Sequence, residues 1–174
     1  MKIKSAMGYQ LLRLVSILII LGALFAIAIT MLMNPLHNEP KIILEASINT
    51  LNEDEKSYIG LGEDEDYDLN NFKGYHFKLY VENIEDRVIQ VPDYVSIWNK
   101  GGEHIYWSGN SYKQDNTSEE FAQYGYDSTI NTTNLDQEEI RELLNSESVR
   151  VEWSAKDGSR EVRTYRVGDL VEFN

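Results

Sequence analysis

The feature that most constrains this chain is an uninterrupted apolar run near its N-terminus, residues 14–33. These 20 residues read LVSILIILGALFAIAITMLM and contain no charged side chain. A helix of this length spans about 30 Å, which is the thickness of the hydrocarbon layer of a bilayer. A helix in a soluble domain is seldom apolar on every face for so long. The run therefore predicts a single N-terminal transmembrane helix.

The charges that flank this run predict how the helix is oriented. Three basic residues lie within residues 1–13, and no acidic residue occurs before residue 34. Basic flanks are retained on the cytoplasmic side of a membrane. We therefore expect residues 1–13 in the cytoplasm, residues 14–33 as a signal anchor, and the C-terminal part outside the cell.

A cleaved signal peptide is the alternative to an anchor. Ala26-Ile27-Ala28 is an A-x-A pattern after an apolar run, and cleavage after Ala28 would release the rest as a secreted protein. Apolar residues continue beyond this pattern to Met33, which favours the uncleaved anchor. Both interpretations export the C-terminal part.

One face of the expected helix carries small side chains at four-residue spacing, namely Gly22, Ala26 and Thr30. Such a face lets two membrane helices approach closely and associate. Small residues are also frequent in membrane helices that do not associate. The pattern therefore has two interpretations, helix association or ordinary membrane-helix composition.

The exported part predicts a β protein. Residues 34–40, NPLHNEP, contain two prolines and no apolar periodicity, which is typical of a short linker. Residues 41–174 follow as one domain. Apolar and polar residues alternate most clearly over 75–82, YHFKLYVE, which is the pattern of a strand with one buried face. Further strands are expected at 41–49, 88–91, 94–98, 103–108, 126–133 and 170–173, with 94–98 and 103–108 joined as a hairpin through the turn residues at 99–102.

One short helix is expected at 137–145. Asp136 is a good N-cap, and Glu139 stands three residues further on, which is the pattern of a capping box. Leu135 and Ile140 occupy the positions of a hydrophobic staple across the same helix start.

The sequence also predicts the register of a C-terminal hairpin. Asp157-Gly158 is a signal for a two-residue turn. With that turn, Trp153 faces Val162 on an apolar face. On the other face Glu152 meets Arg163, and Arg150 meets Tyr165 in a cation–π contact.

These elements predict an antiparallel, immunoglobulin-like β-sandwich with one short helix. About seven or eight short strands are expected, and no long helices alternate with them. The chain contains no cysteine, which excludes disulfides and cysteine-based metal sites.

The charge of the exported part excludes one class of partner. From residue 34 onward the chain carries 13 basic and 29 acidic residues, a net charge of −16. Binding of nucleic acid requires Lys and Arg concentrated on one face, so we expect no nucleic-acid partner.

An acidic stretch, GEDEDYDLNN, spaces oxygen-bearing side chains at every second position, as calcium loops do. An EF-hand loop that begins at its first ligand needs glycine at position 6 and glutamate at position 12, and Leu69 and Tyr75 stand there instead. A solvated acidic loop is therefore favoured, and a loosely built calcium site is the alternative. Its ligands would be Asp64, Asp66, Asp68 and Asn70.

Searches for catalytic motifs are negative, since the chain has no G-x-S-x-G, no S-x-x-K, no H-E-x-x-H and no glycine-rich phosphate loop. We therefore expect no catalytic residue and no cofactor. Aromatic residues crowd together after residue 93 and make good contact surfaces for partners. The candidate interaction surface comprises Trp98, Tyr106, Trp107 and Tyr112.

The sequence thus predicts a membrane-anchored, extracytoplasmic, non-catalytic interaction or accessory module that acts on a protein or cell-wall partner. A calcium-responsive adhesion or sensor domain that uses residues 63–70 is the alternative. A third hypothesis is a cell-envelope hydrolase, because a pair of carboxylates suffices for glycoside hydrolysis and this chain has 29 acidic residues.

Overall fold

The computed structural model describes residues 40–60, 67–82, 84, 86–102, 105–116, 118–155 and 157–174. They belong to one compact unit, residues 39–174. The expected anchor at 14–33, with Gly22, Ala26 and Thr30, lies outside the described residues, as do Asp64 and Asp66. Within the described ranges, no helix has the length and apolar character needed to cross a membrane.

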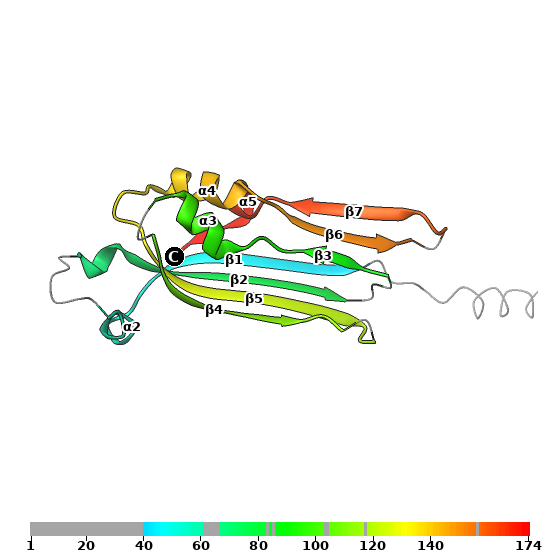
Figure 1. The fold of residues 1–174 in the computed structure, drawn as a ribbon, viewed down its shortest axis with the longest axis horizontal. Coiled ribbons are helices and arrows are strands. Elements are labelled where there is room, and N and C mark those ends of the chain that lie inside the picture. The colour runs from blue at the N-terminus through cyan, green and yellow to red at the C-terminus, as the bar shows by residue number, and fades with distance from the viewer. Residues whose placement is uncertain are drawn as a thin grey trace, which may run out of the picture. The chain divides into compact units, whose positions relative to one another are not determined.

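The described ranges form two β-sheets with short helices between their strands (Figure 1). The elements in chain order are β1 (Lys41–Thr50), α2 (Glu53–Ser57), the 3-10 helix η1 (Leu69–Asn71), β2 (Phe72–Glu82), β3 (Val88–Gln90), α3 (Tyr94–Lys100), β4 (Tyr106–Gln114), β5 (Phe121–Asn131), α4 (Gln137–Asn145), β6 (Val149–Ser154), β7 (Arg160–Tyr165), α5 (Val167–Leu170) and β8 (Glu172–Phe173).

The larger sheet has the strand order β4-β5-β2-β1-β8, and the smaller sheet has the order β3-β6-β7. All pairs are antiparallel except β1 with β8, which run parallel. The predicted two-sheet, mainly β architecture is therefore confirmed. The prediction of one short helix is wrong, since α2, α3 and α5 accompany α4 in the described ranges.

Alternation along β2 builds the inner face of the larger sheet, as the sequence predicts. Tyr75, Phe77, Leu79 and Val81 are each at most 1% exposed, whereas the residues between them face the other side. Because β1 and β5 pair with β2 in register, their inward residues extend the same apolar face. β5 begins at Phe121, five residues before the predicted strand at 126–133.

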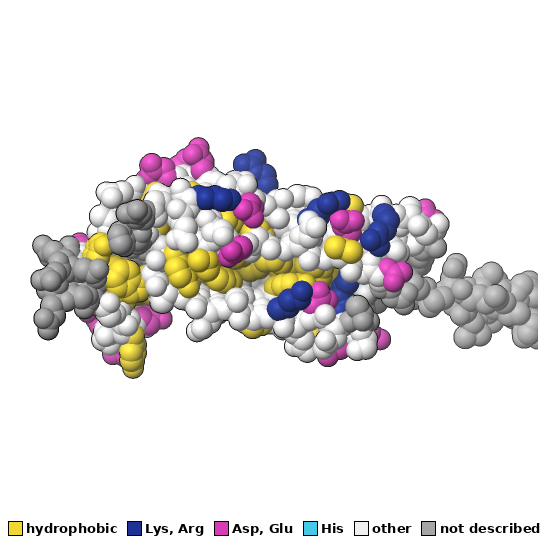
Figure 2. Space-filling view, in the orientation of Figure 1, with side chains coloured by type: hydrophobic (Ala, Val, Ile, Leu, Met, Phe, Trp, Pro, Cys, Tyr) yellow, Lys and Arg dark blue, Asp and Glu magenta, His cyan; other side chains and the backbone are white. Residues whose placement is uncertain are grey.

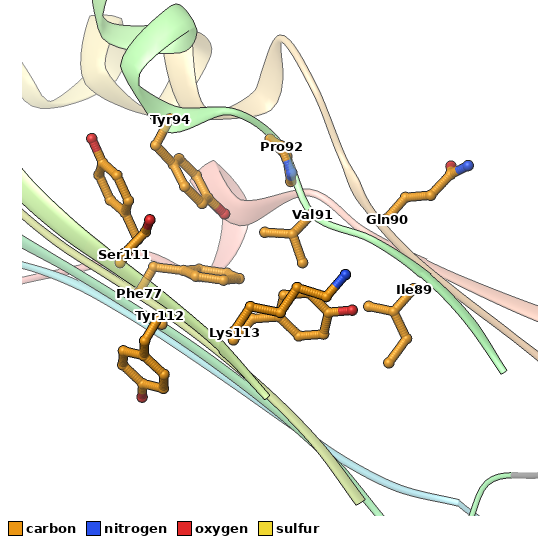
Figure 3. A pocket seen from close by; sticks show the side chains of 12 residues that line it. Phe77, Ile89, Gln90, Val91, Pro92, Tyr94, Ser111, Tyr112 and Lys113 are labelled. Carbon is orange, nitrogen blue, oxygen red and sulfur yellow. The ribbon is translucent and has the colours of Figure 1, made fainter. Parts of the chain in front are cut away.

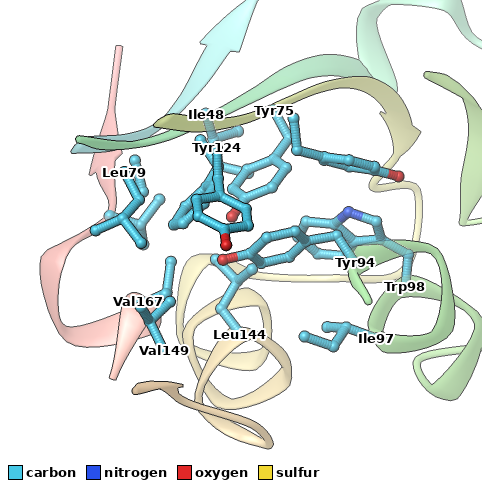
Figure 4. Packing of buried hydrophobic residues seen from close by; sticks show 14 of the residues in the cluster. Ile48, Tyr75, Leu79, Tyr94, Ile97, Trp98, Tyr124, Leu144, Val149 and Val167 are labelled. Atoms are coloured by element: carbon cyan, nitrogen blue, oxygen red, sulfur yellow. The ribbon is translucent and has the colours of Figure 1, made fainter. Parts of the chain in front are cut away.

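The core fills the space between this face, the smaller sheet and the helices (Figure 4). Aromatic rings dominate its centre. The Tyr75 ring lies 5.1 Å from the Trp98 ring and 5.3 Å from the Tyr94 ring, measured between centroids. These inclined ring packings add to the free energy gained from burial of the rings.

The segment 94–98, predicted as a strand, is part of helix α3. The Asp93 carboxylate caps this helix and accepts the Val95 N–H at 3.1 Å. Tyr94, Ile97 and Trp98 are buried, and their spacing of three and four residues is that of one helical face. The predicted hairpin between 94–98 and 103–108 is therefore also wrong, and β4 pairs with β5 instead.

The C-terminal hairpin forms, but its predicted register is wrong by one residue. Ala155 N–H donates to Ser159 C=O at 2.8 Å, so the loop between this pair has three residues and includes Gly158 at φ +80°. Trp153 consequently faces Glu161.

Two predicted contacts across this hairpin are replaced as a result of the slip. Arg163 stacks over the Trp153 ring at 5.3 Å instead of facing Glu152. Arg150 forms an ion pair with Glu152 of its own strand at 2.9 Å, and its predicted contact with Tyr165 is absent from the observed pairing.

Helix α4 is confirmed over the predicted residues. The Asp136 carboxylate accepts the N–H groups of Glu138 and Glu139 at 2.9 Å. Glu139 Oε2 in turn accepts the Asp136 N–H at 2.8 Å, which completes the capping box. Ile140 and Leu144 bury the inner stripe of the helix in the core.

Candidate binding groove

A groove opens between the two sheets on the side where β4 and β3 are the edge strands. Its volume is about 590 Å³. Figure 2 shows a band of hydrophobic side chains running along this face. The lining consists mainly of apolar and aromatic residues: Phe77, Ile89, Val91, Pro92, Tyr94, Tyr124 and Tyr126. This volume and lining are typical of sites for small molecules or peptide side chains.

The strand register decides which residues of β4 face the groove. Ser111 pairs with Tyr126, and Lys113 pairs with Tyr124, so these two β4 residues lie on the inner face with the buried tyrosines. Tyr112 lies between them in sequence and faces the opposite side. Its ring covers the position that a side chain at Gly125 would occupy.

Two buried tyrosine hydroxyls, those of Tyr94 and Tyr126, lie behind the groove wall. Neither meets strict hydrogen-bond geometry among the described residues, but the Tyr94 hydroxyl lies close enough to that of Tyr75 for the two to affect each other's pKa. Tyr94 is only 2% exposed, and Figure 3 shows its hydroxyl near Val91. Burial raises the pKa of Tyr94, so the group is a neutral hydroxyl at physiological pH.

Among the described residues that line the groove, Lys113 is the only charged one. Its ammonium lies 5.3 Å from the centroid of the Tyr124 ring, which holds the cation at the groove rather than away from the sheet. The groove therefore offers an apolar surface and one cation.

A buried ion pair holds the chain together near Tyr124. Arg87 Nε donates to Asp115 Oδ1 at 2.9 Å, and the two side chains are 4% and 16% exposed. The remaining guanidinium N–H groups donate to main-chain carbonyls, among them those of Glu119 and Phe121 at 2.9 and 3.0 Å. Arg87 thus fixes the β4–β5 connection against the segment that precedes β3.

Asp115 also accepts a hydrogen bond from the Tyr124 hydroxyl. Burial alone would raise the pKa of Asp115, but the hydrogen bonds from Tyr124 and Arg87 and the charges of Arg87 and Lys113 lower it overall. Burial and the Asp115 carboxylate raise the pKa of Tyr124. The carboxylate is therefore charged and the phenol neutral across the physiological range.

The four residues of the predicted interaction surface do not form one surface. Trp98 is completely buried in the core, so its assignment to a surface is wrong. Trp107 packs on Phe72 at 5.1 Å and on Tyr67 at 5.8 Å, in a separate aromatic cluster. Tyr106 pairs with Ile130 at the start of β4. Tyr112 is 44% exposed and belongs to the groove lining, but its ring lies over Gly125 on the opposite face of the sheet.

The described half of the predicted calcium loop has local structural contacts. Asp68 caps η1 by accepting the Asn70 N–H at 2.9 Å. The Asn70 side-chain oxygen accepts a hydrogen bond from the Lys56 ammonium at 3.0 Å. Among the described residues, no group of three or more acidic, histidine or cysteine side chains is arranged to hold a metal ion.

A histidine–carboxylate pair lies on the outer face of the larger sheet. His76 Nδ1 and Asp127 Oδ1 are 2.5 Å apart, and both side chains are exposed. Ser47 stands opposite His76 in the neighbouring strand, but its hydroxyl accepts a hydrogen bond from the Asn49 amide at 3.0 Å. A serine nucleophile needs a hydrogen bond to its base, and the described contacts contain none between Ser47 and His76.

Of the residues that line the groove, the predicted interaction surface included only Tyr112. Lys113 is one lysine among many polar residues, and nothing in its neighbourhood marks it. Tyr124 and Tyr126 flank Gly125, and this alternation was the available signal for two inward rings on one strand.

Comparison with protein-family models, with curated proteins and with solved structures finds no match to this chain. The chemistry of the groove is therefore the basis on which a function can be assigned.

Proposed function

We propose that this chain is a non-catalytic binding module that holds an elongated, mostly apolar ligand in the groove between β3 and β4. The observation that carries the proposal is a groove of about 590 Å³ with apolar and aromatic walls and the Lys113 cation on its β4 side. A site with apolar walls and few polar groups binds through burial of apolar area and is oriented by those polar groups.

The charge at the groove defines the ligand further. Lys113 would attract a carboxylate or another anionic group at the groove mouth. The ligand class is thus an apolar molecule or side-chain array with one anionic group.

The setting of this module is a second part of the proposal. The apolar run at 14–33 and its basic flank support a single-pass anchor with residues 41–174 displayed outside the cell. An accessory role toward a protein or cell-wall partner fits that placement. The immunoglobulin-like class of the sandwich is likewise proposed, on strand number and antiparallel pairing.

Titration of the full-length protein with anilinonaphthalene sulfonate tests the groove, because this dye combines apolar rings with an anion. We expect enhanced dye fluorescence on binding. Val91→Asp should weaken binding by about tenfold or more, since it places a charge among apolar walls. Lys113→Gln should weaken it by about threefold to tenfold, because it removes the cation.

Two control variants make this test specific. Lys78→Gln removes a lysine from the opposite face of the same sheet, and Val162→Asp places a charge on the exposed strand β7. Neither should change the affinity for the dye. Equal effects of groove and control variants would overturn the proposal.

A further inference from the structure

The edge of the larger sheet at β4 is exposed over residues 108–114. Among the described residues, β4 pairs only with β5. The free N–H and C=O groups of such an edge form a template for another strand.

Proteins usually protect an edge of this kind with charged side chains, prolines or bulges. β7, the edge strand of the smaller sheet, carries Arg160, Glu161 and Arg163 within six residues. β4 carries one charge, Lys113, in nine residues and no proline, and its one register shift lies at its start, between Tyr106 and Ser108. β4 is therefore less protected by charge than β7, and its inward lysine is the one charge that an added strand has to pair.

The open edge borders the groove. Ser111 and Lys113 of β4 line one side, and the segment Ile89–Pro92 lines the other. A strand added beside β4 would direct every second side chain toward the inner face of the sheet, where the groove lies. Its backbone would satisfy the edge while its inward side chains filled the apolar volume.

We propose that the ligand of the groove is an extended peptide segment that adds to β4 as a further strand. Its inward side chains are apolar, and one inward acidic residue pairs with Lys113. This inference rests on the proposed function, because it names the ligand of the same groove. It takes a peptide rather than a free amphiphile, since only a peptide also satisfies the free backbone groups of β4.

The probe is the synthetic peptide Ac-TVTVTET-NH2, in which both valines and the glutamate fall on one face of a strand. Addition to the full-length protein should displace the bound dye and slow hydrogen exchange of β4 amides. Two N-methylated peptides test the backbone pairing. One is methylated at the backbone nitrogens of the valines and the glutamate, and the other at those of the threonines. In a strand only one of these two sets of N–H groups points toward β4.

Strand addition predicts that one N-methylated form loses binding by about tenfold or more and the other binds as the parent does. Equal binding of both forms, or no binding of the parent peptide, would overturn the inference. If the dye still depends on Val91 and Lys113 while the peptide does not bind, only the peptide inference fails. If the dye does not depend on these residues either, the proposed function fails with it.

A charge exchange provides a second measurement that does not depend on backbone modification. Lys113→Glu should weaken the glutamate peptide and strengthen the matched peptide Ac-TVTVTKT-NH2. If Lys113→Glu still preferred the glutamate peptide, Lys113 would not contact the glutamate, and the inference would be overturned. If protection of the β4 amides from hydrogen exchange rose with protein concentration in the absence of peptide, a second copy of the chain would occupy the edge. That result would also overturn the inference.

Discussion

Arg87 and Asp115 form an ion pair with a 2.9 Å separation between Nε and Oδ1, although 28 residues separate them in sequence. The guanidinium is almost fully buried and also donates to the main chain of the β4–β5 connection. Because the Tyr124 ring lines the groove and its hydroxyl donates to Asp115, this pair anchors one wall of the binding groove.

Arg87→Ala should destabilise the protein by about 3–5 kcal/mol, because it leaves the Asp115 carboxylate buried without its cation. Arg163→Ala is the matched control. Arg163 lies on exposed β7 over the Trp153 ring, so its loss should cost about 0.5–1 kcal/mol. Urea unfolding of both variants measures the difference, and similar losses would contradict a stabilising role for the Arg87 network.

The lowered pKa of Asp115 predicts a pH dependence of stability. A carboxyl whose pKa is lower in the folded state stabilises the fold at pH above its unfolded value, about 3.9. That contribution is lost as the pH falls through the lowered folded pKa. Asp115→Asn should therefore cost about 1.5–3 kcal/mol at neutral pH and progressively less in acid. A difference between wild type and variant that stays constant down to pH about 2 would contradict this linkage.

The three-residue loop of the C-terminal hairpin depends on Gly158, whose φ of +80° is unfavourable for a residue with a Cβ. Gly158→Ala should destabilise the protein by about 1–2 kcal/mol, and Gly158→Asn by less, because asparagine tolerates this conformation better. Gly60→Ala is the control, because a Cβ there meets no atom of the described residues within 4 Å. Thermal unfolding that ranks alanine and asparagine equally at position 158 would argue against the observed loop.

The burial of Trp98 predicts a large loss of stability on truncation. Trp98→Ala removes a completely buried ring that packs on Tyr75, and it should cost about 3–5 kcal/mol. Tyr58→Ala removes a ring that is 87% exposed and should change stability by less than about 0.5 kcal/mol. If both variants left the free energy of unfolding almost unchanged, Trp98 would have to lie on the surface, as the sequence predicted.

Local rules predicted the elements whose signals are local. The capping box at Asp136 and Glu139 determines the start of α4, and both hydrogen bonds form as expected. β2 is similarly recognisable, because alternation from Tyr75 to Val81 requires no information beyond the segment itself. Both elements combine a clear period with a clear burial pattern.

Segment 94–98 shows where composition misleads. Tyr, Val, Ile and Trp favour strands, yet the Asp93 cap and the inward positions Tyr94, Ile97 and Trp98 give a helix. The helical spacing of the apolar residues was present in the sequence, but five residues are too few to distinguish a helical period from a strand period.

The hairpin register could not be derived from pairing patterns, because β7 is exposed along most of its length. Burial selects a register only where one face is buried, and here both faces of β7 contact solvent. The groove was beyond sequence reasoning for a related reason. Its walls, Val91, Tyr94 and Lys113, come from separate elements that meet only in the folded unit.

The central claim, that the groove beside β4 is a binding site, can be tested through the absence of cysteine from the chain. Ser111→Cys and Asn110→Cys place single thiols on neighbouring residues of β4, the first facing the groove and the second facing outward. Maleimide labelling rates are measured for each full-length variant with and without anilinonaphthalene sulfonate. We predict that the dye slows labelling at position 111 by about fivefold or more, provided that it occupies most of the sites, and leaves position 110 unchanged. If the dye left the labelling rate at position 111 unchanged, or slowed both positions equally, the result would contradict a ligand site in this groove.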